Sequence, residues 1–205
     1  MAATKLLNPR GYLSWTQINL WLQNPETYIR RYIHGDAGFT NSGMQFGSKV
    51  SKALEGGVEE ADGAMEALVS LLPRYDTPEL EIRVPLKTPK GSVDLLGRMD
   101  TFRAKPLGFR EYKTGRVKWT QAKAERHKQM PHYGTLIYLK HGGIPEAWLD
   151  WAETEEVEGE VRLTGRIESF HVNLSMAAVL QYMALASRVA QEIDAAYRAE
   201  LKKMA

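Results

Sequence analysis

The chain has 205 residues, of which 43% are hydrophobic and 25% are charged, as in an ordinary globular protein. It contains no cysteine, which excludes an iron–sulfur cluster and a thiolate zinc site and leaves no disulfide argument for secretion. The net charge of +2 neither requires nor excludes a nucleic-acid partner.

The sequence also lacks the marks of a membrane or exported protein. Its N-terminus has no apolar signal-peptide core, and no stretch of about 18 apolar residues is available to span a membrane. We therefore expect a cytoplasmic protein without a membrane partner. A chain of this length removes roughly 70% of its unfolded surface from water, so we expect one stable domain over residues 1–205.

The first third of the chain is predicted to be helical. Ser14 can cap a helix whose apolar residues recur at the helical period, and Asn24-Pro25 interrupts it before a second short helix. Glycines make residues 35–43 a loop. Further helices are predicted over residues 45–55 and 59–72, before Pro73.

From Glu79 the pattern changes to strands, predicted over residues 81–86, 93–103 and 107–112 and joined by short turns. A helix over about 120–140 follows, in which Pro131 predicts a kink or a first-turn position. Two more strands, near 147–154 and 161–173, are joined by an acidic loop, and Ser175 caps a long helix to about Leu201.

This order of elements predicts an α/β fold in which a central mixed β-sheet is flanked by helices. We expect a single domain with a helical part at about 12–72, a core at about 79–173 and a C-terminal helix at about 175–201. Charge is unevenly spread, because residues 113–128 are basic and residues 150–160 are acidic. Both segments can be solvated faces, but the basic one directly follows the strand that carries the candidate chemistry.

That chemistry lies at the ends of two neighbouring predicted strands. Asp100 ends one strand, and Glu111 and Lys113 occupy alternate positions of the next, so their side chains leave the same face while Tyr112 points to the other. Two carboxylates and a backbone carbonyl form an oxygen site suited to Mg²⁺ or Mn²⁺. A lysine ammonium beside them can orient an attacking water or neutralise charge on a phosphoryl oxygen, and the metal polarises the phosphate, as phosphodiester hydrolysis requires. The alternative is a surface ion pair between Glu111 and Lys113.

In three motifs the chain resembles the PD-(D/E)XK nuclease superfamily, in its RecB-like exonuclease branch. They are Gly97-Arg98-Met99-Asp100, Glu111-Tyr112-Lys113-Thr114-Gly115, and Gln129-Met130-Pro131-His132-Tyr133. The resemblance implies a restriction-endonuclease-like core. It also implies roles for individual residues: Asp100 and Glu111 as metal ligands with the Tyr112 carbonyl, Lys113 as the catalytic lysine, and Gln129 and Tyr133 as groups that face the site and hold DNA.

The resemblance extends to the N-terminal helices, with two departures. Asn24 stands where cluster-binding members carry a cysteine, so the iron–sulfur subgroup is not expected. Ser51 stands where many members place a metal-binding histidine, and a hydroxyl is a poor metal ligand. One metal site is therefore expected and a second is in doubt. Glu55, one helical turn after Ser51, can supply a carboxylate instead or be a solvated acid at a helix end.

Other candidate residues surround this motif. The histidines lack zinc-site spacing, and His127 and His132 either contact phosphate or lie on the surface. Trp119 is a candidate for stacking on an unpaired base. The basic residues expected to follow a phosphate backbone are Arg116, Lys118, Lys123, Arg126 and Lys128.

These observations together predict a metal-dependent DNA nuclease. The resemblance implies an exonuclease acting on single-stranded or end-exposed DNA in recombination, repair or phage-type DNA processing, with a helicase, a recombinase or a single-strand-binding protein as further partners. Two alternatives in which the protein is not an active enzyme stay open. One is a catalytically weakened nucleic-acid-binding subunit, suggested by Ser51, and the other is a structural partner of a helicase or recombinase. A cluster-less end-trimming nuclease of CRISPR adaptation is the alternative within the same fold.

Overall fold

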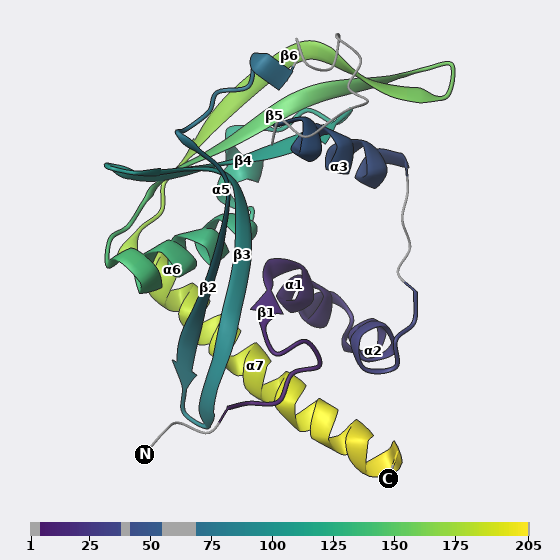
Figure 1. Ribbon diagram of the computed structural model, residues 1–205, viewed down its shortest axis with the longest axis vertical. Coiled ribbons are helices and arrows are strands. Elements are labelled where there is room, and N and C mark those ends of the chain that lie inside the picture. The colour runs from purple at the N-terminus through teal and green to yellow at the C-terminus, as the bar shows by residue number, and fades with distance from the viewer. Residues whose placement is uncertain (1–4, 38–41, 55–68, 205) are drawn as a thin grey trace.

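The strands of the protein form one six-stranded mixed sheet, seen in a computed structural model that describes residues 5–37, 42–54 and 69–204 (Figure 1). The strands are β1 (Leu13–Ser14), β2 (Thr77–Thr88), β3 (Gly91–Ala104), β4 (Leu107–Gly115), β5 (Glu146–Val157) and β6 (Glu160–Val172). The helices are α1 (Trp15–Gln23), α2 (Pro25–Tyr28), the π-helix η1 (Ile29–Ile33), α3 (Ser42–Leu54), α5 (Gln121–Glu125), α6 (Gln129–His141) and α7 (Met176–Met204).

The sheet order is β1-β3-β4-β5-β6, with β2 also paired to β3. Neighbours β2–β3, β3–β4 and β5–β6 are antiparallel, whereas β1–β3 and β4–β5 are parallel. The parallel β4–β5 pair requires a crossover, which α5 and α6 supply. The predicted α/β class with a central mixed sheet flanked by helices is thereby confirmed.

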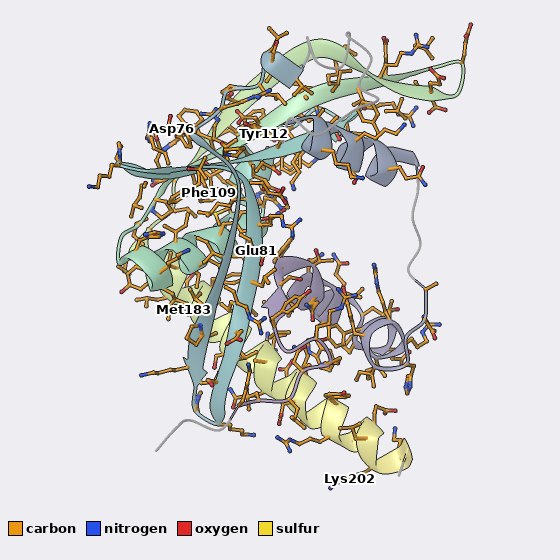
Figure 2. All side chains as sticks on the ribbon, viewed as in Figure 1. Asp76, Glu81, Phe109, Tyr112, Met183 and Lys202 are labelled. Atoms are coloured by element: carbon orange, nitrogen blue, oxygen red, sulfur yellow. The ribbon has the colours of Figure 1, made fainter. Side chains whose placement is uncertain are left out.

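Helices cover the two faces of the sheet unequally. The main core lies on the face covered by α1, α6 and α7, and it includes Ile18, Phe109, Leu136 and Val189. On the other face, Phe46 and Val50 of α3 pack against Tyr112. Phe109 and Tyr112 therefore lie on opposite sides of β4 (Figure 2). This is the alternation that a strand imposes on its side chains.

Several predicted element ends are confirmed by their capping contacts. The Ser14 hydroxyl accepts from the Gln17 N–H at the start of α1. Asn24 ends α1 and its side chain accepts from the Thr27 N–H, so Asn24-Pro25 does interrupt the helix. The Ser175 hydroxyl accepts from the Ala178 N–H before α7. Capping residues predict where a helix begins because each cap accepts from an N–H that the helix itself leaves unpaired.

Two predicted elements are wrong. The single helix over 120–140 is two helices, α5 and α6, and Pro131 lies in the first turn of α6, where its missing N–H costs no helical hydrogen bond. The acidic loop is instead strand: β5 continues to Val157, and the turn is Glu158-Gly159. The acidic end of β5, residues 153–157, is compatible with a strand because its glutamate side chains reach water or nearby arginines.

The helix predicted over 59–72 and the candidate Glu55 fall largely or wholly outside the described residues. Ser51 lies within α3, and its side chain is likewise outside what the structure describes. Over the described part of the chain, no helix combines the length and apolar character needed to cross a membrane.

Candidate active site

The candidate active site lies where β3 and β4 separate. Their pairing runs from Ala104↔Leu107 to Thr101↔Arg110, so the next position would place Asp100 opposite Glu111. At that point the Asp100 carboxylate takes the place of a backbone partner, because its Oδ2 accepts from the Tyr112 N–H at 2.6 Å. The fork thus brings the two predicted carboxylates together, as the sequence pattern indicated.

Glu111 and Lys113 leave β4 on the same face, as predicted, and meet Gln129 at the start of α6. The Lys113 ammonium donates to Glu111 Oε1 at 2.6 Å and to Gln129 Oε1 at 2.9 Å. The Gln129 Nε2 group donates to the same Glu111 oxygen at 2.7 Å. The ion pair between Glu111 and Lys113 that the alternative predicted is present, but Glu111 is only 4% exposed, so the pair does not lie at the surface.

Tyr133 ties this group to the main chain of β3. Its hydroxyl accepts from Gln129 Nε2 and donates to the Arg98 carbonyl, both at 2.6 Å. Gly97 allows α6 to approach this closely, because a Cβ there would lie 2.4 Å from Leu136 Cδ1 and 2.9 Å from a Tyr133 ring carbon. Gly97 of the first motif is therefore needed for the packing of α6 against β3. The Tyr133 hydroxyl, in turn, holds the Gln129 amide in position.

The electrostatics of the fork favour a cation. Burial and the neighbouring Glu111 carboxylate raise the pKa of Asp100 well above its usual value. Glu111 Oε2 is buried and has no hydrogen-bond partner among the described atoms. Two crowded carboxylates with an unsatisfied oxygen are a donor set that a hard divalent ion fits, since Mg²⁺ commonly uses one or two carboxylates and completes its shell with water and substrate.

The number of protein ligands is small. Within the ranges that the structure covers, no group of three or more histidine, aspartate or glutamate side chains gathers to hold a metal. The two carboxylates of Asp100 and Glu111 are thus the described candidates, with the Tyr112 carbonyl as a further predicted ligand. Whether Glu55 joins them lies outside the described residues.

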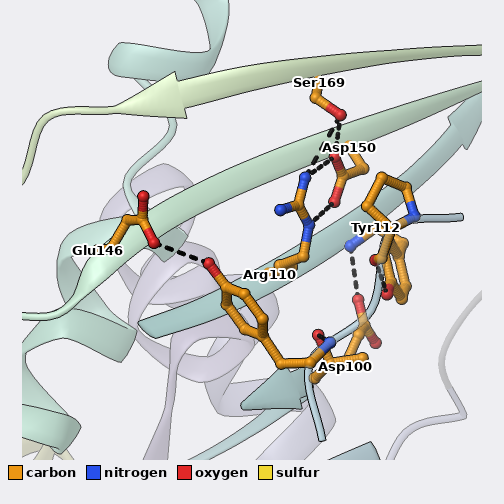
Figure 3. A network of polar contacts seen from close by, with 9 residues as sticks. Asp100, Arg110, Tyr112, Glu146, Asp150 and Ser169 are labelled. Carbon is orange, nitrogen blue, oxygen red and sulfur yellow. Dashed lines mark hydrogen bonds and ion pairs between the residues drawn. The ribbon is translucent and has the colours of Figure 1, made fainter. Parts of the chain in front are cut away.

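A second polar network supports β4 from behind, on the face opposite Glu111 (Figure 3). The Arg110 guanidinium donates to both oxygens of Asp150 at 2.7 Å, and the Ser169 hydroxyl donates to Asp150 at 2.5 Å. The Tyr112 hydroxyl donates to the Pro73 carbonyl at 2.6 Å. The contacts of Arg110, Asp150 and Ser169 connect β4, β5 and β6. Sequence reasoning missed them because Arg110 and Ser169 lie 59 positions apart.

The two histidines singled out from the sequence have different positions. His132 is fully buried, within 3.0 Å of both the Tyr182 hydroxyl and the Leu96 carbonyl, so neither a surface nor a phosphate-binding position fits it. It holds α6 against α7 and β3. His127 is half-buried between the rings of Trp15 and Trp119, and burial and Lys113 lower its pKa to about 4.

The basic residues after β4 do not form one free patch. Arg116 pairs with Glu156 of β5 at 3.0 Å and Lys118 pairs with Glu168 of β6 at 3.0 Å, so acids of both strands partly neutralise these two cations. Lys123 instead lies over the Trp119 ring, 4.2 Å from its centroid. Arg126 and Lys128 are exposed beside α6. The predicted basic surface is therefore limited to fewer residues than the sequence indicated.

Comparison with models of protein families gives no match, and comparison with curated protein sequences gives none either. Among solved structures, the fold resembles that of a protein named "Putative exonuclease" from Eubacterium rectale, with a TM-score of 0.60 and 12% identity over 90% of this chain and 83% of that chain. The structure of SSO0001 gives a TM-score of 0.46 at 15% identity, covering 89% and 76% of the two chains, which is too low to support a shared fold. The first likeness shows that the two proteins share a fold.

Proposed function

We propose that this protein is a metal-dependent deoxyribonuclease of the PD-(D/E)XK type. The observation that carries the proposal is the convergence of Asp100, Glu111 and Lys113 at the fork of β3 and β4, with one Glu111 oxygen buried and unpartnered. The fold shared with a protein named as an exonuclease supports the same reading. Exonucleolytic action on single-stranded or end-exposed DNA, in recombination, repair or phage-type DNA processing, is the form of the activity that we propose.

Asp100 and Glu111 would hold Mg²⁺ or Mn²⁺ in this site. A bound divalent ion polarises a phosphoryl oxygen and lowers the pKa of bound water, which phosphodiester hydrolysis needs because a negative nucleophile must approach a negative phosphate. The chain's own contribution is to fix the two carboxylates. The Tyr112 N–H orients Asp100, and the Gln129 amide together with the Lys113 ammonium orients Glu111.

Lys113 is placed to act on the reacting groups. The described residues take two of its three ammonium N–H groups, through Glu111 and Gln129. The remaining N–H is available to an attacking water or to a phosphoryl oxygen, whose developing charge it would stabilise. Because the side chain is held at two points, little reorganisation is needed when the substrate binds.

The decisive test is nuclease activity with and without this lysine. Purified protein is incubated with end-labelled single- and double-stranded DNA in Mg²⁺ or Mn²⁺, and the same reactions are run in EDTA. Lys113→Ala is expected to reduce cleavage by about 100-fold or more, the loss typical of removing one electrostatic catalytic group. Lys105→Ala, in the exposed turn between β3 and β4, is the matched control and should cleave normally.

The outcomes separate the alternatives. Equal cleavage by the Lys113→Ala protein would refute the site assignment. Intact DNA together with salt-sensitive binding would refute the nuclease and favour a binding subunit. An independent measurement is Mn²⁺ binding by calorimetry: Asp100→Asn and Glu111→Gln should weaken it, whereas Glu125→Gln on the surface of α5 should not.

A further inference from the structure

A small aromatic cluster adjoins the candidate active site without taking part in the mechanism above. Trp119 follows the end of β4 by four residues, and its ring contacts His127 with a centroid distance of 5.2 Å. His127 also contacts the edge of Trp15 at 6.3 Å and lies close enough to Lys113 for that ammonium to depress its pKa. The cluster therefore packs on the face of the sheet that carries Lys113 and lies near its ammonium.

The Trp119 side chain is partly packed against its neighbours and partly exposed. It is half-buried and packs against the main core, with His127 between it and Trp15. Over the ring lies the ammonium of Lys123, 4.2 Å from its centroid, and this lysine is exposed. A flexible, solvated lysine is easily displaced from a ring face, so the covered face is one that another flat group can occupy.

We infer that Trp119 and Lys123 form a binding site for one unpaired nucleotide of the DNA strand that is cut. The base stacks on the Trp119 ring in place of the Lys123 ammonium, which moves to the phosphate of the same nucleotide. Aromatic stacking accepts any base, since every base has a flat face, and the lysine supplies the charge that a phosphate attracts. A base within a duplex cannot reach this ring, so the site selects single-stranded DNA. The inference rests on the proposed function for the identity of the substrate.

The geometry of a cation over an aromatic ring supports this exchange. Cation–π contacts at exposed positions are weak, whereas stacking of a base on an aromatic ring is stronger and leaves the ammonium free to pair with phosphate. One nucleotide thus gives both residues a stronger contact: its base stacks on Trp119, and its phosphate pairs with Lys123. The adjacent His127 is neutral at pH 7, because its pKa is lowered to about 4, and so adds no charge of its own to the platform.

The test is binding without cleavage, measured by fluorescence anisotropy of labelled DNA in EDTA. Three probes of equal length are compared: a single-stranded oligothymidine, the same strand with abasic sites, and a blunt duplex. Trp119→Leu, which keeps apolar volume but removes the ring face, is expected to weaken oligothymidine binding by about 5- to 100-fold, the equivalent of one lost stacking contact. Binding of the abasic strand and the duplex should change little. Trp119→Phe should restore most of the affinity.

The matched control is Trp148→Leu, a half-buried tryptophan on the far side of the sheet, where it lies under Arg110. This variant should bind all three probes like the wild type. Lys123→Gln should weaken oligothymidine and abasic strands alike and reduce the salt dependence of binding by about one phosphate contact. Circular dichroism and thermal unfolding of each variant verify that it is folded.

Three results would overturn the inference: no binding of single-stranded DNA by the wild type, an unchanged oligothymidine affinity in Trp119→Leu, or an equal loss of affinity for the oligothymidine and the abasic strand in Trp119→Leu. These results are distinct from a failure of the proposed function. A protein that cleaves no DNA but loses oligothymidine affinity selectively in Trp119→Leu still has the site. A protein that cleaves DNA normally but shows no such loss lacks it.

Discussion

Gln129 contacts both Glu111 and Lys113 of the candidate site. It accepts from Lys113, donates to Glu111 and is itself held by the Tyr133 hydroxyl. We predict that Gln129→Ala lowers the rate of DNA cleavage by about 10- to 100-fold, the usual effect of losing a group that orients a metal ligand. Single-turnover cleavage at saturating Mn²⁺ measures it.

The matched control for Gln129 is Gln121→Ala at the start of α5, where the glutamine is exposed and contacts Glu125 and the His171 carbonyl. It should cleave DNA at the wild-type rate. If Gln129→Ala cleaved equally well, Gln129 would be no more than a packing residue.

Gly97 shows how one missing side chain sets the distance between β3 and α6. A methyl group there would meet Leu136 at 2.4 Å and the Tyr133 ring at 2.9 Å. Gly97→Ala should therefore reduce the free energy of unfolding by about 1–3 kcal/mol, as overpacked cores do, and displace Tyr133 from Gln129. Urea unfolding measures the first effect and cleavage the second. Gly115→Ala, with nothing within 4 Å of its Cβ, should change stability little.

At the scale of elements, His132 joins helix α6 to α7 and to strand β3. It is fully buried, and burial lowers its pKa to about 4, below the 6.5 of an exposed histidine. The unfolded chain therefore binds a proton that the folded chain does not. Its contribution to stability is complete above about pH 6.5 and is lost as the pH falls toward 4, by up to about 3 kcal/mol.

The measurement is urea unfolding between pH 7 and pH 4. His132→Gln should show a shallower loss of stability over this range than the wild type. The pKa of His127 is also lowered, so part of the pH dependence of the wild type comes from His127. The effect of His132 is therefore the difference between the curves of the wild type and His132→Gln. The exposed His141→Gln variant should follow the wild type. Parallel curves for wild type and His132→Gln would contradict the prediction.

The same scale shows where sequence reasoning failed. The sequence predicts one helix in place of α5 and α6 because residues 126–128 carry no glycine or proline to end a helix. It predicts a loop at the acidic end of β5 because charged residues favour solvent exposure. The deciding contacts of this end of β5 lie outside the local sequence, since its strand pairing depends on β6.

For the whole molecule, a net charge of +2 conceals ion pairs that decide which cations face a substrate. Glu168 of β6 binds Lys118 and Arg166 together, and the hydrogen bond from Lys118 lowers the pKa of this half-buried carboxyl. Glu168→Gln should release both cations, tighten DNA binding by about 2- to 5-fold and steepen its salt dependence. Anisotropy titrations between about 50 and 200 mM salt measure both effects. Over this range the affinity of a protein with roughly 6–10 phosphate contacts falls by about 10³- to 10⁵-fold.

The control for this prediction is Glu200→Gln near the end of α7, which removes the same charge and an ion pair with Lys203 far from the fork (Figure 1). It should leave DNA binding unchanged. An equal gain in both variants would show that net charge alone, and not the placement of Glu168, controls the affinity.

The sequence by itself determined the parts of this protein that depend on neighbours along the chain. Alternation placed Glu111 and Lys113 on one face of β4 and Tyr112 on the other, helix spacing aligned Gln129 with Tyr133, and capping residues marked the helix ends. The side-chain directions follow from the periodicity of strand and helix, and the helix ends from side chains that cap them, so both depend on residues close together in the sequence.

The tertiary structure decided what depends on partners far apart in the sequence. It buried Glu111 and left one of its oxygens unpartnered, placed His132 in the core, and joined Arg110 to Asp150 on the other face of β4. It also paired Arg116 with Glu156 of β5 and Lys118 with Glu168 of β6 but left Lys123 over Trp119. Burial and charge pairing are properties of packed surfaces, so they exist only once β3, β4, β5 and α6 are assembled.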